Sequence, residues 1–600
     1  MPKAQVVVVD FGAQYANLIA RRVRQLGVYC EIALPEEPLE SLLQCKGIIL
    51  SGGPASVYEK NAPAVSEKIF SLGKPVLGLC YGHQLMAQLL GGKVEKGKIR
   101  EYGAAELEIK NKAAIFSGLG KKENVWMSHG DKVSALPKGF EAIASTADCG
   151  NAAVADFERN FFGLQFHPEV THTAKGMKIF ENFVFGVCGC RKDWSMRDFA
   201  REKIDEIKKQ AGEKNVFLLA SGGVDSTVAL ALLSKALGKE RVFSLHVDTG
   251  FMRKNESKGI KEALESLGYC SLKVAGAEAQ FFGALQGVSE PEKKREIIGN
   301  LFIQVQREQL EGLGFNSGEW LLGQGTIYPD TIETAETKHA AKIKTHHNRV
   351  PVIKEMIESG KVIEPLSKLY KDEVREVGEL LGLPKEIVWR HPFPGPGLAI
   401  RCLCSNGKES PVQKGLDERL SKAAGKFGFD AMALPVRSVG VQGDSRTYAH
   451  PALLQETLDW KKIEKASTAL TNGFAEINRC VFAVAPEKIR LVELHEAYLT
   501  KQRIKTLQEA DAIVMDAIAK HGLMQEIWQF PTILLPLSVN GKGEAIVLRP
   551  VESKEAMTAR FYPLEKSVLK EIAEELMALK GIGAVFYDAT HKPPATIEWE

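Results

Sequence analysis

Short runs of apolar residues recur through the first third of the chain, and each run ends at a glycine or a polar turn. Such runs open the segments 4–14 and 47–56 and fill residues 75–79, after which apolar residues recur with helical spacing over 84–90. Strands that are apolar on both faces and alternate with helices are typical of a parallel sheet with helices on both sides. We therefore predict a doubly wound α/β domain over residues 1–190.

The same alternation begins again further along the chain. A charged, helical stretch near residue 190 separates the first domain from apolar runs that open the segments 216–237 and 320–330. Prolines and glycines then crowd into residues 390–402, where they stop regular structure. We predict a second doubly wound α/β domain over residues 191–390.

The last part of the chain mixes amphipathic helices with strands in which apolar and polar residues alternate. The segment "EAIVLRPVES" (544–553) is one such strand. We expect an α+β region over residues 391–600, appended to two α/β domains.

The composition is that of an ordinary globular protein of several domains, because 600 residues exceed what one core normally holds. The 78 basic and 75 acidic residues leave a net charge of +3, which does not favour a nucleic acid or a membrane surface. No run of 18 apolar residues occurs, and the first residues are typical of a strand rather than a signal peptide. Ten cysteines without a CxxC pair favour reduced thiols. We therefore expect a cytoplasmic protein with neither nucleic acid nor membrane as partner.

One cysteine stands at a sharp bend between a strand and a helix. In "KPVLGLCYGHQLMAQLLGG" (74–92), only Cys80 and the three residues after it separate the apolar run 75–79 from the helix expected at Gln84. A nucleophile on such a strand-to-helix turn points out of the fold, and the helix N-terminus lowers the pKa of a thiol. Cys80 is thus a candidate nucleophile, the alternative being one more buried structural cysteine.

A candidate base and a group to orient it follow another apolar run. In "GLQFHPEVTHT" (163–173), Pro168 stiffens the chain between His167 and Glu169, so that their side chains can point the same way. The carboxylate can then hold the imidazole tautomer while the imidazole takes the thiol proton. The glycine turn at residues 51–54 offers backbone N–H groups for an oxyanion.

These segments resemble the class I glutamine amidotransferase family over residues 1–190. The resemblance implies that the thiol attacks the side-chain amide of glutamine, that ammonia leaves, and that water hydrolyses the thioester. The implied catalytic residues are Cys80, His167 and Glu169, and the implied oxyanion and glutamine-binding residues are Gly53, Tyr81 and Gln84. We expect His83 and residues 128–131 to shape the pocket.

A glycine loop in the second domain follows a strand and opens a helix, a context in which phosphate groups bind. The segment "ASGGVDST" (220–227) lacks the lysine of a Walker loop, and the alternative is a tight turn with an Asp–Ser helix cap. Its pattern resembles the ATP pyrophosphatases, which split ATP between the α- and β-phosphates and transfer AMP to an oxygen. The implied ATP-binding residues are Ser221, Gly222, Gly223, Val224, Asp225, Ser226 and Thr227. Asp225 is also the expected Mg²⁺ ligand, so ATP with Mg²⁺ is the expected co-substrate, with no prosthetic group.

Motifs spread over the rest of the chain resemble the GMP synthase family. They are "GQGTIYPD" (323–330), "RHPFPGPGLAIR" (390–401), "LPVRSVGVQGD" (434–444), "LRPVESKEAMTARF" (548–561) and "KPPATIEWE" (592–600). The resemblance implies that xanthosine 5′-monophosphate (XMP) is adenylated at its purine 2-oxygen, and that ammonia from glutamine displaces AMP to give GMP. The alternative is an amidotransferase-fused adenylating enzyme acting on another acceptor such as tRNA, which predicts a basic RNA-binding surface.

The same resemblance implies five XMP-binding residues, which are Arg295, Asp444, Gln529, Lys592 and Glu598. The charges of Arg295 and Lys592 suit a phosphate, and Asp444 suits ribose or base N–H groups. The segment "IKTHHN" (343–348) is expected to form a lid over the nucleotide, and we assign no metal to its adjacent histidines.

The C-terminal region carries an insertion relative to short members of the family. In the short members the motif "LPVRSVGVxGD" runs directly into the "VES–MTA" strand. Here about a hundred residues intervene, and a second version of the strand, at residues 532–550, precedes "VESKEAMTARF". We infer a duplicated dimerisation-type unit, with subunits over residues 391–510 and 511–600. Because this unit pairs two chains in the short form, we expect a monomer or a weak homodimer.

Overall fold

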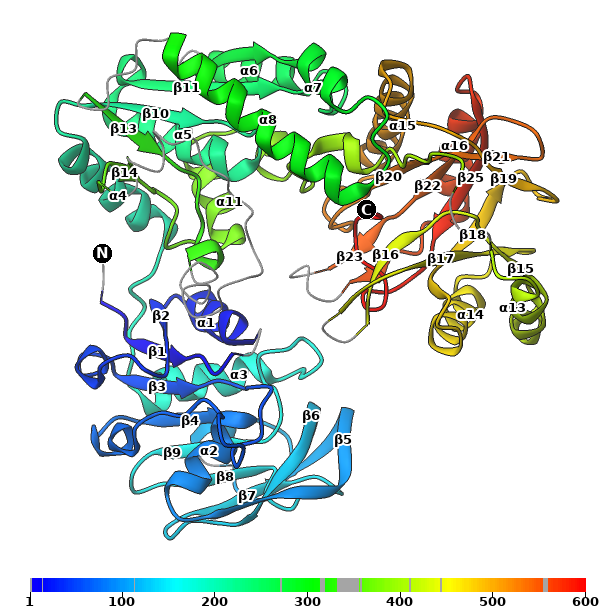
Figure 1. Cartoon of the computed structure of the whole chain (residues 1–600). Helices are drawn as coiled ribbons and strands as arrows, with labels where there is room; N and C mark the ends of the chain where they lie inside the picture. Colours follow the sequence, from blue (N-terminus) through cyan, green and yellow to red (C-terminus); the bar gives the residue numbers. More distant parts are fainter. Residues whose placement is uncertain are drawn as a thin grey trace. The chain divides into compact units, whose positions relative to one another are not determined.

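The structure is a computed structural model that describes residues 3–12, 15–112, 114–269, 272–312, 319–331, 356, 359–408, 412–442, 445–553 and 559–600. The chain forms two compact units, Met1–Glu202 and Lys203–Glu600. In Figure 1 the first unit is coloured blue to cyan, and the second runs on through green and yellow to red.

A nine-stranded sheet forms the centre of the first unit, in the order β2-β1-β3-β4-β9-β8-β7-β5-β6. Its strands are β1 (Val6–Val9), β2 (Cys30–Ala33), β3 (Gly47–Leu50), β4 (Val76–Leu79), β5 (Lys93–Ile109), β6 (Lys122–Ala135), β7 (Glu141–Ser145), β8 (Ala153–Asp156) and β9 (Phe161–Leu164). The five strands from β2 to β9 are parallel, which confirms the predicted α/β sheet. From β9 to β6 every pairing is antiparallel, an extension that the apolar runs did not predict.

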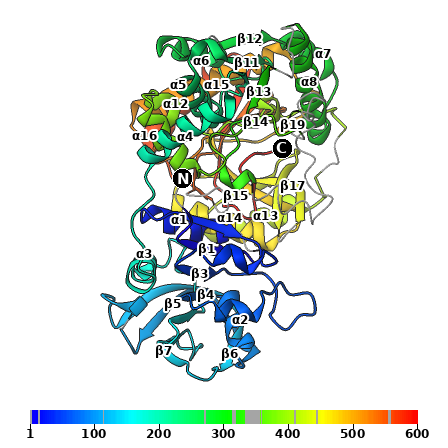
Figure 2. The ribbon, with the colours of Figure 1, turned by 90° about the vertical axis from the view of Figure 1, so that its left-hand side faces the viewer.

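Helices cover the parallel part of this sheet. They are α1 (Tyr15–Gln25), α2 (Tyr81–Leu89), α3 (Gly176–Glu181), the short 3₁₀ helices η1 (Leu39–Leu42), η2 (Glu67–Ser71) and η3 (Ala114–Phe116), and the π-helical turn η4 (Asn182–Val187). Helix α1 packs on β1 and β2, and α2 packs on β4 and β9 (Figures 1 and 2). Strands β1, β3, β4 and β9 are buried at every position, as expected for strands covered on both faces.

Five parallel strands form the first sheet of the second unit, in the order β12-β11-β10-β13-β14. The strands are β10 (Asn215–Leu219), β11 (Val242–Asp248), β12 (Leu272–Gly276), β13 (Trp320–Gly323) and β14 (Val362–Ile363). The helices are α4 (Met196–Ala211), α5 (Val224–Leu237), η5 (Lys239–Arg241), α6 (Glu256–Ser266), α7 (Glu278–Ala284), α8 (Pro291–Gly312), α11 (Lys371–Leu380), α12 (Lys385–Val388) and η6 (Gly397–Ile400). This all-parallel sheet confirms the second α/β arrangement predicted from the sequence.

A seven-stranded mixed sheet follows in the same unit, in the order β15-β17-β18-β25-β22-β20 with β16 paired to β17. Its strands are β15 (Asp430–Ala433), β16 (Ser438–Gln442), β17 (Ser445–Gln455), β18 (Ile477–Ala485), β20 (Thr532–Leu535), β22 (Glu544–Leu548) and β25 (Ile582–Asp588). Two small strand pairs accompany it, β19 (Val492–Leu494) with β21 (Leu537–Val539) and β23 (Val551–Glu552) with β24 (Arg560–Phe561). The helices are α13 (Leu416–Ala424), η7 (Gly425–Phe427), α14 (Trp460–Gly473), α15 (Lys501–Lys520) and α16 (Lys566–Met577). Among the helices that the structure describes, none combines the length and the apolar character needed to cross a bilayer.

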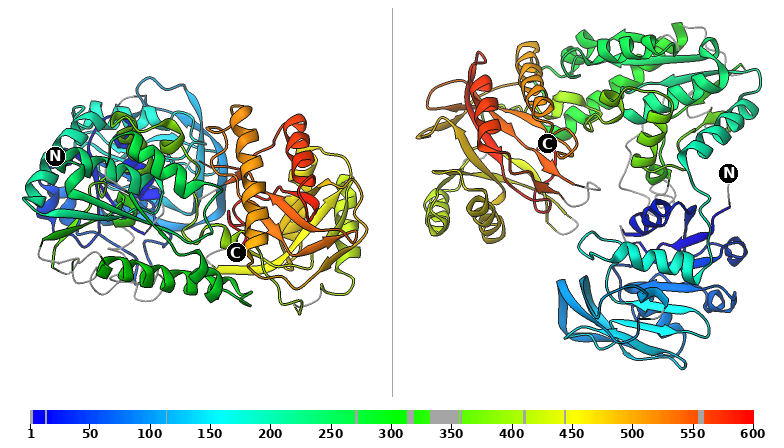
Figure 3. Two further views of the ribbon diagram at one scale, coloured as in Figure 1. Left: turned by 90° about the horizontal axis from the view of Figure 1, so that it is seen from above. Right: turned by 180° about the vertical axis from the view of Figure 1, so that it is seen from behind.

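The two faces of the seven-stranded sheet belong to different apolar clusters, as the alternation along its strands requires. Leu534 and Ile546 point to the face that packs against α13, α14, α15 and α16. Ile533, Val547 and the tail residue Trp599 belong to the cluster on the other face. The sheet is therefore buried on both sides. Figure 3 shows the orange helix α15 and the red helix α16 side by side over this sheet.

The seven-stranded sheet consists of two halves with the same topology. Each half contains a helix, an edge strand, two further strands, a second helix and a central strand. The first half is α13-β15-β16-β17-α14-β18, with η7 after α13, and the second is α15-β20-β21-β22-α16-β25, with the pair β23–β24 after β22. In each half the edge strand is antiparallel to its neighbour, and that neighbour is parallel to the central strand. The central strands β18 and β25 pair antiparallel, so an approximate two-fold axis relates the halves.

The second half of this repeat begins at α15. The expected division between residues 510 and 511 therefore falls inside a helix. Helix α15 packs against α16 and β20 of the second half. The two halves also share a leucine–proline pair at the end of the edge strand. In the first half Leu434 directly follows β15, and in the second Leu535 is the last residue of β20.

Helix α2 approaches β3 so closely that only glycine fits between them. A Cβ on Gly82 would lie 2.3 Å from the carbonyl oxygen of Leu50. We expect Gly82→Ala to displace α2 and to lower the free energy of unfolding by about 1–3 kcal/mol, as overpacking does. Urea denaturation of the full chain measures this difference. Gly186→Ala is the matched control, because a Cβ there meets nothing within 4 Å; equal losses in both variants would contradict the explanation.

Candidate active sites

The structure confirms a sharp turn at Cys80 and makes it tighter than the sequence predicted. Strand β4 ends at Leu79 and helix α2 begins at Tyr81, three residues before the expected start at Gln84. Cys80 alone forms the bend, with φ 49° and ψ −102°, and its N–H donates to Leu164 O at 2.7 Å. A non-glycine residue in this region is strained, as in the nucleophile elbow of hydrolases.

The reason for the early start of α2 is the close packing of glycines around the turn. A Cβ on Gly78 would lie 2.7 Å from the backbone of Gly82, so the strand and the first helical turn touch directly. Gly82 N–H donates to Ser51 O at 2.9 Å, which ties the helix to the glycine turn after β3. Gly53 in that turn lies against Tyr81, because a Cβ on Gly53 would be 3.0 Å from Tyr81 Cγ. The predicted oxyanion segment and the start of α2 are therefore neighbours.

His167 and Glu169 form the predicted pair at the end of β9. His167 Nδ1 lies 2.6 Å from Glu169 Oε1, and their side chains are 3% and 0% exposed. Burial by itself would lower the pKa of His167, but its interactions with Glu169 and then with Cys80 outweigh burial, and the pKa lies well above its ordinary value. The imidazole is thus oriented by the carboxylate and lies beside the thiol.

Gln84 is buried behind Cys80, and it meets a residue that the sequence reasoning did not single out. Its Nε2 donates to Asp131 O at 2.9 Å and to Gln165 Oε1 at 3.2 Å. Gln165 Nε2 in turn donates to Cys80 Sγ at 3.7 Å. Gln165 stands in the "GLQFHPEVTHT" motif, so its position was visible in the sequence while its direction was not.

The phosphate loop of the second unit spans the turn between β10 and α5. Gly222 has a left-handed φ of 78°, and Gly223 N–H donates to Ser221 Oγ at 3.2 Å. The hydroxyls of Ser226 and Thr227 donate to Gly223 O at 3.1 and 2.9 Å. These bonds join the loop to the first turn of α5, whose N-terminal N–H groups are suited to a phosphate.

Two basic side chains that the sequence reasoning missed contact this loop. Lys371, at the start of α11, pairs with Asp225 at 2.5 Å. Arg390 donates to Gly222 O and to Glu256. Both lie far along the chain from the loop; Arg390 opens the motif at 390–401, but the motif does not show which loop it contacts.

Asp225 fits the role of a Mg²⁺ ligand. Its Oδ1 is buried and has no hydrogen-bond partner among the described residues, while Oδ2 binds Lys371. Carboxylate oxygens are preferred ligands of Mg²⁺, which is usually held by one or two of them together with substrate phosphates. Across the described ranges, no group of three His, Cys, Asp or Glu side chains is arranged to hold a metal ion. The residues therefore suit Mg²⁺ that arrives with a nucleotide.

Three of the five residues expected to contact XMP lie together at the C-terminal tail. Gln529 Nε2 donates to Glu598 Oε1 at 3.2 Å, and Arg295 donates to Glu600 O at 2.5 Å. Glu598 also accepts two bonds from Arg401, at 3.0 and 2.8 Å. The acidic tail is thus held by cationic side chains from α8 and from the segment after η6.

Arg401 is a residue of this cluster that the sequence reasoning quoted but did not single out. It is fully buried, and Asp511 and the ring of Phe393 also contact it. Burial by itself would lower the pKa of Arg401, but Glu598 and Asp511 outweigh it and raise the pKa. The carboxylate of Glu598 is therefore held rigidly on its arginine side.

Lys592 lies at the start of the tail, where its backbone pairs with Ala559. Burial, and then the charge of Arg549, lower the pKa of Lys592. Asp444 and the expected lid at 343–348 lie outside the described residues.

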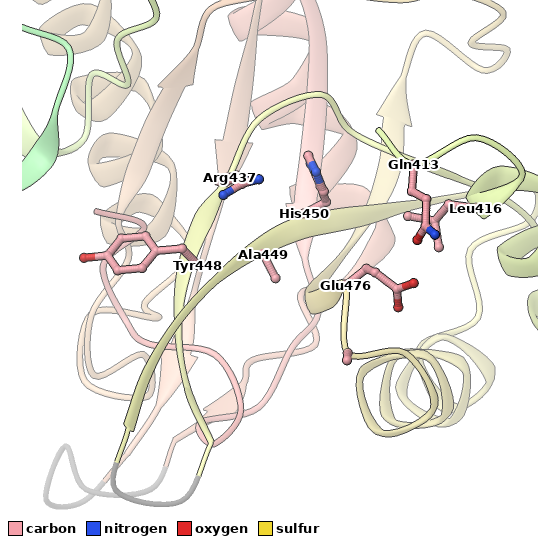
Figure 4. Close-up of a pocket in the computed structure, with 8 residues that line it drawn as sticks. Gln413, Leu416, Arg437, Tyr448, Ala449, His450 and Glu476 are labelled. Carbon is pink, nitrogen blue, oxygen red and sulfur yellow. The ribbon is translucent and has the colours of Figure 1, made fainter. Parts of the chain in front are cut away.

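A hollow of about 220 Å³ lies beside the hairpin of β16 and β17. Figure 4 shows the side chains around it, which are Gln413, Leu416, Arg437, Tyr448, Ala449, His450, Ala475 and Glu476. Pockets that bury most of a small-molecule ligand hold roughly 300–1,000 Å³. The hollow is too small for a nucleotide and is not a candidate active site.

Three family models match successive parts of the chain. Residues 7–187 match "Glutamine amidotransferase class-I", residues 195–296 match "NAD synthase", and residues 516–599 match "GMP synthase C terminal domain". The first match contains the site around Cys80, and the second contains the phosphate loop. The protein is thus of the class that joins a glutamine amidotransferase to an ATP pyrophosphatase, a ligase that forms C–N bonds.

Relatives extend this likeness to the whole chain. A Leptospira interrogans protein described as "Probable GMP synthase (glutamine-hydrolyzing)" is 48% identical over 603 residues, 99% of each chain. The GMP synthase (glutamine-hydrolyzing) of Brachyspira hyodysenteriae is 38% identical over 610 residues, again 99% of each. The chain belongs to the glutamine-hydrolysing GMP synthase family. These names give no support to the alternative of a tRNA acceptor.

Members of the family differ in length. The GMP synthase of Caldicellulosiruptor saccharolyticus is 44% identical over 510 residues, which are 99% of that protein but only 81% of this chain. Part of this chain therefore has no counterpart in the shorter relative.

The buried His83 of α2 makes the first unit sensitive to acid. Burial, together with the nearby His129, lowers the pKa of His83 to about 3. Below pH 6.5 the unfolded chain then binds a proton that the folded chain does not, so the free energy of unfolding falls as the pH falls toward 3. We expect His83→Met to reduce the loss of unfolding free energy between pH 7 and 5.5 by about 1.3 kcal/mol.

Pulsed hydrogen exchange of the peptide containing α2, across a urea series, measures the unfolding of this unit within the full chain. The other titrating groups affect both proteins equally and cancel in the difference. Identical pH dependence in the two proteins would contradict the assignment to His83.

Proposed function

We propose that this chain converts XMP, ATP and glutamine into GMP, AMP, pyrophosphate and glutamate. The observation that most strongly supports this function is the buried arrangement of Cys80, His167 and Glu169, in a chain that also has a phosphate loop. Its relatives are named glutamine-hydrolyzing GMP synthases, which supports XMP as the acceptor.

In the first unit, Cys80 is the nucleophile of the glutaminase reaction. His167 takes the thiol proton, and the sulfur forms a bond to the side-chain amide carbon of glutamine while the C=O electron pair moves to oxygen. The N–H groups near Gly53 and Tyr81 stabilise this oxyanion, and Gln84 supports the pocket. As the C=O bond re-forms, the C–N bond breaks, and His167 gives its proton to the leaving ammonia. Water, activated by the same imidazole, then hydrolyses the thioester to glutamate.

In the second unit, residues 220–227 bind the phosphates of ATP. The loop N–H groups and hydroxyls hold the pyrophosphate portion of ATP. Lys371, which pairs with Asp225 in the structure, binds a phosphate oxygen in its place when ATP is present. Asp225 would hold Mg²⁺, which neutralises phosphate charge when it is bound. The 2-oxygen of XMP attacks the α-phosphate, so that a P–O bond forms and pyrophosphate leaves with the bridging electron pair.

The adenylyl-XMP intermediate then reacts with ammonia. Ammonia forms a bond to the purine 2-carbon, AMP leaves with the C–O electron pair, and a proton is lost to give GMP. Arg295 and Lys592 would bind the XMP phosphate. Gln529 and Glu598 are supported as a pair by their mutual hydrogen bond, and Asp444 completes the proposed set.

We propose three domains: the amidotransferase over residues 1–190, the ATP pyrophosphatase over residues 191–390 and the dimerisation-type region over residues 391–600. We further propose that the protein works in the cytoplasm, without nucleic acid, as a monomer or weak homodimer. The two matching halves of the seven-stranded sheet support this oligomeric state, because β18 and β25 already pair within one chain.

Replacement of the proposed nucleophile separates the two activities. We expect Cys80→Ala to lower glutamine-dependent GMP formation by about 10³-fold or more while ammonia-dependent formation stays near that of the native chain. The assay mixes protein, Mg-ATP, XMP and either nitrogen source, and follows the fall in XMP absorbance.

Cys149→Ala is the matched control, because Cys149 is also a buried free cysteine of the first unit and should leave both activities intact. Loss of both activities in a folded Cys80→Ala protein would contradict the two-site mechanism. Consumption of XMP without formation of AMP would contradict the adenylation step.

The oligomeric state is tested by sedimentation velocity at sub-micromolar concentration without ligands. We expect the mass of a single chain, because each half of the sheet already has its partner in the other half. A tight dimer under these conditions would contradict the proposal.

A further inference from the structure

Gln165 lies directly beside the sulfur of the proposed nucleophile. It directly follows β9 in the sequence and is fully buried, and its Nε2 is 3.7 Å from Cys80 Sγ. Nothing in the expected triad uses this residue. A buried amide is held in place by its hydrogen bonds, so its orientation follows from its partners.

The backbone oxygen of Asp131 determines which group of each glutamine side chain donates and which accepts. Asp131 O is a backbone carbonyl and can only accept, so Gln84 must present its NH₂ group to it. The same Nε2 donates to Gln165, which must therefore offer its oxygen to Gln84. The NH₂ group of Gln165 is left facing Cys80 Sγ. The two amides thus form a relay that directs an N–H donor at the sulfur.

The second contact of the sulfur, with the backbone oxygen of Ser128, favours the protonated thiol over the thiolate. Cys80 Sγ lies 3.7 Å from Ser128 O, a carbonyl to which only a protonated thiol can donate. Once the proton moves to His167, this contact no longer attracts the sulfur, whereas an N–H donor binds a thiolate more strongly than a thiol. Gln165 therefore favours the reactive form of Cys80.

We propose that Gln165, oriented by Gln84 on the backbone of Asp131, donates a hydrogen bond that holds and stabilises the thiolate of Cys80 for attack on glutamine. This inference rests on the proposed role of Cys80 as the nucleophile. It assigns Gln84 a second task, which is to orient Gln165 rather than only to line the pocket.

The test is Gln165→Met, which keeps the length of the side chain and removes the donor. We expect the glutaminase kcat to fall about 10- to 100-fold, the usual effect of losing a hydrogen bond to a charged group, with KM for glutamine changed less than about twofold. Alkylation of Cys80 by iodoacetamide, read by peptide mass spectrometry across a pH series, should have its midpoint about one pH unit higher. His167, which lies beside the sulfur, and Glu169, which binds His167, are the same in both proteins and affect the two curves alike.

Gln84→Met provides a second variant that does not touch the sulfur. It should move the alkylation midpoint in the same direction by a smaller amount, and the double variant should add little to Gln165→Met because both act through one relay. Ammonia-dependent GMP formation should remain within about twofold in every variant.

An unchanged alkylation midpoint together with an unchanged kcat in folded Gln165→Met would overturn the proposal. A rise in KM alone would also overturn it, since that result would mean a glutamine-binding role. Failure of the underlying function is distinguishable, because Cys80→Ala would then retain glutamine-dependent activity.

Discussion

The geometry of the amidotransferase site depends on one constraint, a change from strand to helix within a single residue. Cys80 accepts a strained backbone because Gly78 and Gly82 let β4 and α2 touch. With no spacer between the elements, the start of α2 is set against the turn after β3. The residue three places after Tyr81, Gln84, is then buried beside the neighbouring strand β9. The thiol, its helix and its base are thus parts of one rigid arrangement.

Buried charges in both units are paired with specific partners rather than left to solvent. His167 is held by Glu169 in the first unit, and Glu598 is held by Arg401 in the second. Removing one member of such a pair is costly, about 3–5 kcal/mol, because the other charge stays buried. The pairs therefore orient side chains more than they add stability. In the second unit, Arg401 thus orients the carboxylate of Glu598 in the acidic tail.

The sequence predicted those features that depend on local pattern. Apolar runs identified both parallel sheets, and the turn at Cys80 with the pair His167–Glu169 could be found from spacing. The start of α2 was placed too late because the contact between Gly82 and Leu50 O involves another strand. Lys371 and Arg401 were missed for a related reason: their partners lie 146 and 197 positions away, which no short pattern records.

The duplicated sheet has a consequence for how this protein can change over generations. In a pair of identical chains, every substitution appears on both sides of the symmetry axis at once. Here each half is encoded separately and can diverge alone. The two halves already differ, because the first has a long hairpin of β16 and β17 where the second has a short turn between β21 and β22. One half is thereby free to specialise while the other keeps the shared interface intact.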